Sequence, residues 1–159
     1  MPRRRPRTLR IEQWKPPHGL YRQIPWPTRV DRLFPRTVSA VHRAETLRWG
    51  DESGIWPGAT AAALWSYRRF LGRRGRHLYV LRSRCGCFGC ELEVNVTVAR
   101  DVLELVVPTL PRRARAELEE LLADLDERLW RRTLPDPTAT RNPGRAWWHT
   151  RIVDETSHL

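Results

Sequence analysis

The strongest constraint on the fold is a leucine repeat between residues 112 and 131, which predicts a long amphipathic helix. Its leucines recur at steps of three and four, while acidic residues fill the other faces. They are Leu118, Leu121, Leu122, Leu125 and Leu129. Pro111 stands where a first-turn proline is tolerated, and arginines gather at the opposite end, where the helix dipole is negative. A helix with one leucine face needs an apolar partner surface elsewhere in the chain.

The expected partner surface is a small antiparallel sheet. Residues 92–98 alternate apolar and polar side chains, the pattern of a half-buried strand. Its apolar residues are Leu92, Val94, Val96 and Val98. A turn at residues 99–101 leads into the apolar run 102–107, which we interpret as the returning strand, and residues 77–83 supply the first strand. The three strands form a meander whose first connection is a cysteine-rich turn at residues 85–90.

Two further helices are expected before the sheet. Residues 38–50 have apolar residues near one side, and the alanine-rich segment 60–71 favours a helix that Gly72 ends. The predicted fold class is therefore α+β: a small three-stranded antiparallel meander packed by two or three helices.

The distribution of proline divides the chain into an arm, a core and a tail. Residues 1–37 contain seven of the 13 prolines among arginines and tryptophans, which predicts an extended Arg/Pro/Trp-rich N-terminal arm. Residues 38–134 form the expected core domain. The tail at residues 135–159 is polar apart from a short apolar stretch around Trp147 and Trp148, and we expect it to pack on the core as a C-terminal clip.

The charge of the chain is divided unevenly. The formal net charge is +11, but residues 1–90 carry +14 and residues 91–159 carry −3. Such asymmetry points to an anionic partner, with nucleic acid first and an acidic protein or a membrane surface behind it. Lys15 is the single lysine beside 28 arginines, a bias typical of a GC-rich bacterial coding sequence, so the preference for arginine is not itself a sign of phosphate binding.

All three cysteines lie within six residues. Cys87 and Cys90 have the C-x-x-C spacing of a zinc knuckle, and Cys85 is a third candidate ligand. The intervening glycines give the backbone the freedom that a metal-binding turn needs. These features predict a Zn²⁺ ion bound by the turn.

A tetrahedral zinc site needs a fourth ligand from another segment. His77 is the first candidate, and His42 and His149 are further ones. Three alternatives remain: a glycine-rich loop without metal, an iron–sulfur cluster, which also needs a fourth ligand, and a redox disulfide. The redox disulfide is disfavoured because a thioredoxin-like C-x-x-C opens a helix, whereas a strand is expected here.

Arginines and aromatic residues are interleaved at residues 1–26 and 67–77. Arginine neutralises phosphates, and exposed aromatic rings stack on unpaired bases. The candidate nucleic-acid-binding residues are Arg3, Arg4, Arg5, Arg7, Arg68, Arg69, Arg73, Arg74 and Arg76. The alternative is a solvated surface in an arginine-rich protein with most tryptophans in the core. RNA or a ribonucleoprotein is favoured over duplex DNA, because an extended arm suits an irregular surface better than a groove.

The motifs of common enzyme classes are absent from the sequence, which has no P-loop, dinucleotide fingerprint, G-x-S-x-G or H-E-x-x-H. We therefore predict a non-enzymatic, nucleic-acid-associated protein. Alternatives are an accessory subunit that binds an acidic protein, and a thiol- or metal-dependent enzyme that uses the three cysteines. The sequence has no apolar run long enough to span a bilayer and no secretory signal pattern, so we expect a cytoplasmic protein.

Overall fold

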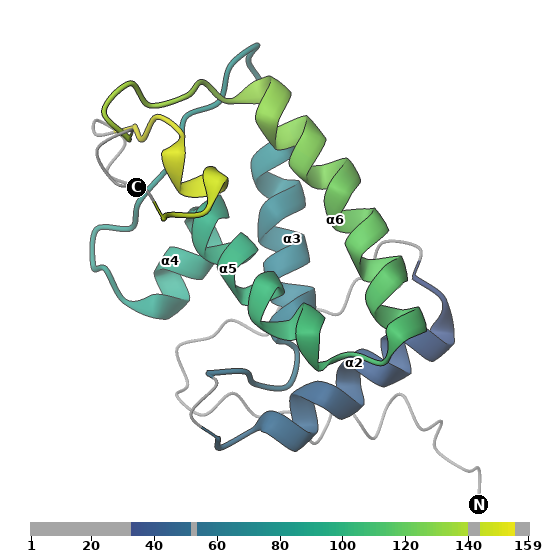
Figure 1. The fold of residues 1–159 in the computed structure, drawn as a ribbon. Coiled ribbons are helices and arrows are strands. Elements are labelled where there is room, and N and C mark those ends of the chain that lie inside the picture. Colours follow the sequence, from purple (N-terminus) through teal and green to yellow (C-terminus); the bar gives the residue numbers. More distant parts are fainter. Residues whose placement is uncertain (1–32, 52–53, 140–143, 155–159) are drawn as a thin grey trace, which may run out of the picture.

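The computed structural model describes residues 33–51, 54–139 and 144–154, and in these ranges the chain is mostly helical (Figure 1). Its elements are the helices α2 (Pro35–Arg48), α3 (Ala59–Leu71), α4 (Phe88–Val94), α5 (Val96–Val106) and α6 (Arg112–Arg132), and the short 3₁₀ helices η1 (Val107–Thr109) and η3 (Trp147–Thr150). Residues 1–32, most of the expected arm, lie outside the described ranges. Residues 35–37 of that arm begin α2.

The predicted antiparallel meander is wrong, since the described residues contain no strand. Residues 92–98 span the end of α4 and the start of α5, and residues 102–107 complete α5 and begin η1. Residues 77–83 are extended but make only isolated bridges, from Leu78 to Thr133 and from Val80 to Val153. The fold is therefore not the α+β class that the alternating pattern predicted.

Three features make a helix of the segment that we interpreted as strand, turn and strand. Its most buried apolar residues recur at steps of three and four: Val96, Ala99, Leu103 and Val106. The side chain of Asn95 caps the helix by accepting the N–H of Thr97 at 3.0 Å. Arg100, which we placed in the turn, instead pairs with Glu104 one helical turn away.

Helix α3 forms the centre of the core. Ten of its 13 residues are buried, as expected for a helix that is apolar on nearly every side. Helices α4, α5 and α6 all contact it, and Figure 1 shows it between α5 and α6. The leucine face of α6 is buried as the repeat predicted, but its partner surface is helical. The buried leucines are Leu118, Leu122, Leu125 and Leu129, and Leu121 is half-buried.

Carboxylates from other helices cap the N-termini of α2 and α3. Glu45 of α2 is fully buried and accepts the N–H groups of Gly58 and Thr60, both at 2.8 Å, at the start of α3. Burial raises the pKa of Glu45 above its ordinary value, although the same hydrogen bonds oppose this rise. Glu117 of α6 accepts the N–H of Phe34 at 2.6 Å and also contacts the hydroxyl of Thr37, at the start of α2. None of the described helices combines the length and apolar character needed to cross a membrane.

Candidate metal centre and basic surface

The three cysteine thiols converge where an exposed loop meets α4, with Cys85 and Cys87 in the loop and Cys90 in the first turn of the helix. The Sγ atoms of Cys85, Cys87 and Cys90 all lie within 4.8 Å of one another, and those of Cys85 and Cys87 are 3.1 Å apart. Gly86 between them has a φ of +62°, a conformation that favours glycine and that turns the chain sharply here. Three cysteines are thus close enough to hold a metal ion together.

A hydrogen-bonded scaffold fixes the two ends of this loop. Glu91, the residue after Cys90, accepts both the N–H and the hydroxyl of Ser83, at 2.7 and 2.8 Å. Its second oxygen accepts the side-chain amide of Asn95 at 2.8 Å. Partial burial alone would raise the pKa of Glu91, but these hydrogen bonds together hold it below its ordinary value. Both carboxylate oxygens are therefore engaged in holding the loop.

Hydrogen bonds among the three thiols shift the pKa values of Cys85 and Cys90 in opposite directions. A hydrogen bond with Cys87 lowers the pKa of Cys85 to about 7. In contrast, a hydrogen bond between Cys90 and Cys87 raises the pKa of Cys90 to about 12. Since the thiolate is the metal ligand and the nucleophile, Cys85 is the residue that is ready to react near neutral pH.

The residues after Cys87 form a helix and not the expected strand. Cys87 is the N-terminal flanking residue of α4, and Cys90 lies in its first turn. Our reason for disfavouring a redox pair, that no helix follows the C-x-x-C, was therefore wrong. Redox chemistry of the thiols stays open beside metal binding.

Among the described residues, the group of side chains that could hold a metal ion together consists of the three thiols only. His77, the first candidate for a fourth ligand, is exposed in the loop after α3 and is not part of the group. His42 lies on α2, and the Nε2 atom of His149 is 2.8 Å from a carboxylate oxygen of Asp101. The structure does not bring these histidines to the cysteine loop.

The predicted arginines of residues 68–76 lie at one end of the helical bundle. Arg68 and Arg69 end α3, and the loop 72–77 that follows carries three more exposed arginines. Arg132 of α6 fixes this loop by donating to the backbone carbonyls of Leu71, Arg73 and Gly75, with distances of 2.9 and 2.6 Å to the last two. Figure 1 shows the ends of α3 and α6 and the loop together at the top of the molecule.

The last turns of α6 add two arginines that sequence reasoning did not include. Arg128 is close enough to Arg68 for their charges to interact: burial lowers the pKa of Arg68, and the charge of Arg128 lowers it further. Arg69 and Arg131 form ion pairs with glutamates. We call this surface the basic end; it comprises Arg68, Arg69, Arg73, Arg74, Arg76, Arg128 and Arg131. The other predicted arginines, Arg3, Arg4, Arg5 and Arg7, lie outside the described residues.

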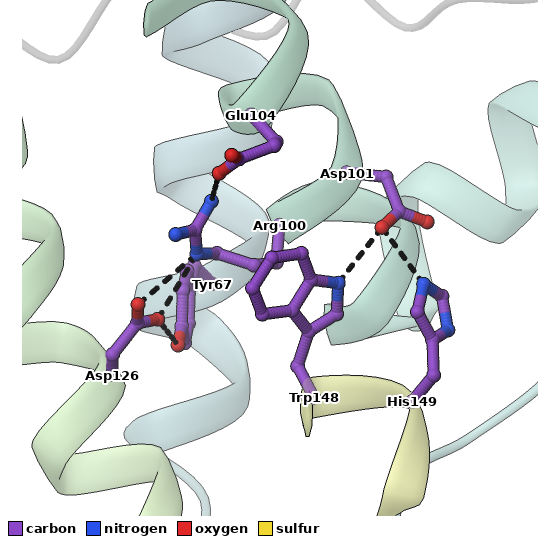
Figure 2. A network of polar contacts seen from close by, with 7 residues as sticks. All are labelled: Tyr67, Arg100, Asp101, Glu104, Asp126, Trp148 and His149. Carbon is purple, nitrogen blue, oxygen red and sulfur yellow. Dashed lines mark hydrogen bonds and ion pairs between the residues drawn. The ribbon is translucent and has the colours of Figure 1, made fainter. Parts of the chain in front are cut away.

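A polar network that the sequence analysis missed joins the C-terminal segment to the core. Figure 2 shows Arg100 between Asp126, which accepts its Nε at 3.1 Å, and the ring of Trp148, 4.2 Å away. The hydroxyl of Tyr67 donates to the same carboxylate at 2.6 Å. Burial and then the charge of Asp126 raise the pKa of Tyr67.

Asp101 extends this network along η3 by accepting the indole N–H of Trp148 at 2.8 Å and contacting His149. The spacing of Arg100 and Glu104 could have revealed one ion pair, but no local pattern distinguished Asp126 from the other acidic residues beside the leucine face of α6. We interpret the network as structural, because its charged groups are already paired with one another.

No protein-family model, curated protein or solved structure matches this chain, so its class has to be argued from its own residues.

Proposed function

We propose that this protein binds Zn²⁺ through the thiolates of Cys85, Cys87 and Cys90. The observation that supports this proposal is the convergence of the three Sγ atoms within 4.8 Å. Thiolates bound to zinc at about 2.3 Å in a tetrahedron stand about 3.8 Å apart, so only small rotations of these side chains are needed. The pKa of Cys85, lowered to about 7, supplies one thiolate near neutral pH, and a bound cation favours ionisation of the others.

The fourth coordination position of this zinc ion is taken by water or by a ligand from outside the described residues. Both oxygens of Glu91, the carboxylate that follows Cys90 in the sequence, are already engaged by Ser83 and Asn95. Because all three thiols are exposed, the ion is accessible to solvent.

The test is a titration of the reduced protein with Zn²⁺, and with Co²⁺ as a coloured substitute. We expect one ion per chain, and for Co²⁺ an intense thiolate charge-transfer band. Cys85→Ser, Cys87→Ser and Cys90→Ser should each abolish stoichiometric binding, while His77→Ala reports whether that histidine contributes. A fully reduced protein that binds neither ion stoichiometrically would refute the proposal.

We further propose that the protein is a non-enzymatic one that associates with nucleic acid in a reducing, cytoplasmic setting, with RNA or a ribonucleoprotein favoured. The observation that favours this second function is the basic end. Among the described residues, no ion pair engages Arg73, Arg74, Arg76 or Arg128, and the Arg132 contacts hold the loop that presents the first three. Exposed cations without an ion-pair partner favour a polyanionic ligand.

This second proposal predicts binding that weakens steeply with salt. Each phosphate neutralised contributes a slope of about −0.7 for single strands or about −0.9 for B-DNA in log affinity against log salt. Replacing Arg73, Arg74 and Arg76 with serine should flatten the slope and weaken binding to most sequences alike. If neither RNA nor duplex DNA binds at low salt, the basic end serves an acidic protein partner instead.

A further inference from the structure

An exposed tryptophan lies in the last turn of α6, next to Arg131 of the basic end. Trp130 occupies the last turn of α6, between the buried Leu129 and the exposed Arg131. Its side chain is 56% exposed although an indole is largely apolar. Buried leucines of the same helix already supply its packing face, so Trp130 is not needed for the core.

The indole ring of Trp130 is held in a fixed position. The guanidinium of Arg151, itself only 3% exposed, lies over the ring at 4.1 Å from the centroid. Arg151 is anchored in turn by donating to the backbone carbonyl of Trp130 at 2.7 Å and to the hydroxyl of Thr133 at 2.8 Å. Trp147 packs edge-on at 5.5 Å between ring centroids. A ring supported in this way loses little freedom when a ligand stacks on it.

Cationic and aromatic groups therefore lie at the same end of α6. Arg132, two residues after Trp130, fixes the arginine-bearing loop 72–77. A second exposed aromatic residue, Tyr79, follows Leu78, whose N–H donates to the backbone carbonyl of Arg132 at 2.6 Å. The C-terminal end of α6 and the loop beside it thus offer both charges for phosphates and rings for bases.

We infer that the basic end binds single-stranded nucleic acid, with an unpaired base stacked on Trp130 while the surrounding arginines contact the phosphates. A ring with an exposed face accepts any unpaired base, because every base has a π-face. The bases of a duplex are already stacked on one another, so a duplex can use the arginines but not the ring. This inference rests on the proposed association with nucleic acid and assigns that association to unpaired strands.

The experiment compares affinities for a short single-stranded RNA, a duplex DNA and heparin over a range of salt concentrations. Trp130→Ala should weaken binding of the single strand about five- to hundredfold, the range of one base–aromatic stack. Binding of duplex DNA and heparin, and the salt dependence for all three ligands, should not change. Trp130→Phe, which keeps an aromatic face, should recover most of the lost affinity.

Two further variants make the result specific. Trp49→Ala removes another exposed tryptophan, 43% exposed at the end of α2, and should leave every affinity unchanged. Serine at Arg73, Arg74 and Arg76 should weaken binding of all three ligands. Thermal unfolding of each variant shows that a change in affinity does not arise from misfolding.

The possible failures are distinguishable. If the arginine variant loses affinity for RNA while Trp130→Ala binds it as tightly as the wild type, the stacking inference is wrong and the association with nucleic acid stands. An equal loss of heparin binding in Trp130→Ala would also overturn stacking. If the unaltered protein binds neither nucleic acid at low salt, the parent proposal is wrong and the inference with it.

Discussion

Single residues matter for the stability of this protein where a side chain accepts hydrogen bonds from N–H groups that have no backbone acceptor. Glu45 is the clearest case, since a fully buried carboxylate satisfies two N–H groups at the start of α3. Helix N-caps usually come from the residue just before the helix, and here Gly58 has no side chain to offer. On folding, Glu45 thus loses its hydrogen bonds to water and gains two buried hydrogen bonds.

We predict that Glu45→Ala lowers the free energy of unfolding by about 2–4 kcal/mol, because it leaves two buried donors unsatisfied. Glu45→Gln keeps one acceptor and should cost less. Because burial raises the pKa of Glu45, its contribution to stability is complete below the ordinary carboxyl pKa and declines as the pH rises through the folded-state pKa. The difference in urea stability between wild type and Glu45→Gln should therefore shrink from acidic to neutral pH; a difference that grows would contradict the assignment.

At the scale of elements, the cysteine loop depends on one carboxylate outside the thiol group. Glu91→Ala removes the acceptor for both donors of Ser83, so the loop loses its link to α4. We expect zinc affinity to fall about 10–100-fold, as for other residues that orient metal ligands. Glu93→Ala, an exposed change on the same short helix, is the control and should leave affinity unchanged. Isothermal titration calorimetry measures the zinc affinity of both variants. If the two affinities are equal, the thiols converge without the hydrogen bonds of Glu91.

The elements also differ in how far the sequence could predict them. The leucine face of α6 was predicted because its period extends over about three turns, long enough to exclude a strand. Helix α5 was missed because the alternation of Val94, Val96 and Val98 continues for only a few residues, where a short apolar run fits either period. Asn95 and the Arg100–Glu104 spacing favour a helix, but the prediction relied on the alternation of residues 92–98 instead.

The candidate site was predictable only where its parts are close in sequence. The cysteine loop was found because three ligands within six residues need no knowledge of the fold. Trp130 and Arg128 were not found, because their relation to the loop 72–77 depends on contacts made by Arg132 across about 60 residues. No local pattern in the sequence encodes such a contact.

For the whole molecule, the network around Arg100 joins α3, α5, α6 and η3 into one unit. Asp126→Ala leaves the guanidinium of Arg100 with one carboxylate partner, the largely exposed Glu104. It also leaves the hydroxyl of Tyr67 without its acceptor. We expect a loss of about 3 kcal/mol in the free energy of unfolding, near the lower end for breaking a buried pair because Glu104 remains. Asp124→Ala, an exposed change on the same helix, should stay within about 0.5 kcal/mol. Chemical unfolding followed by circular dichroism tests both, and similar losses would show that the pair contributes little.

The caps of α2 and α3, the first two helices in the described part of the chain, also set an order of events during synthesis. Glu45 precedes α3 in the chain, so it is already made when α3 leaves the ribosome. Thr37 and Glu117 are 80 residues apart, so the cap of α2 is still missing when α2 emerges. At about 5–20 residues per second, the ribosome needs roughly 4–16 s to supply it. Helix α2 is therefore among the last of the described helices to be completed. In a nascent chain stalled before α6, the N-terminal end of α2 lacks the cap that Glu117 provides.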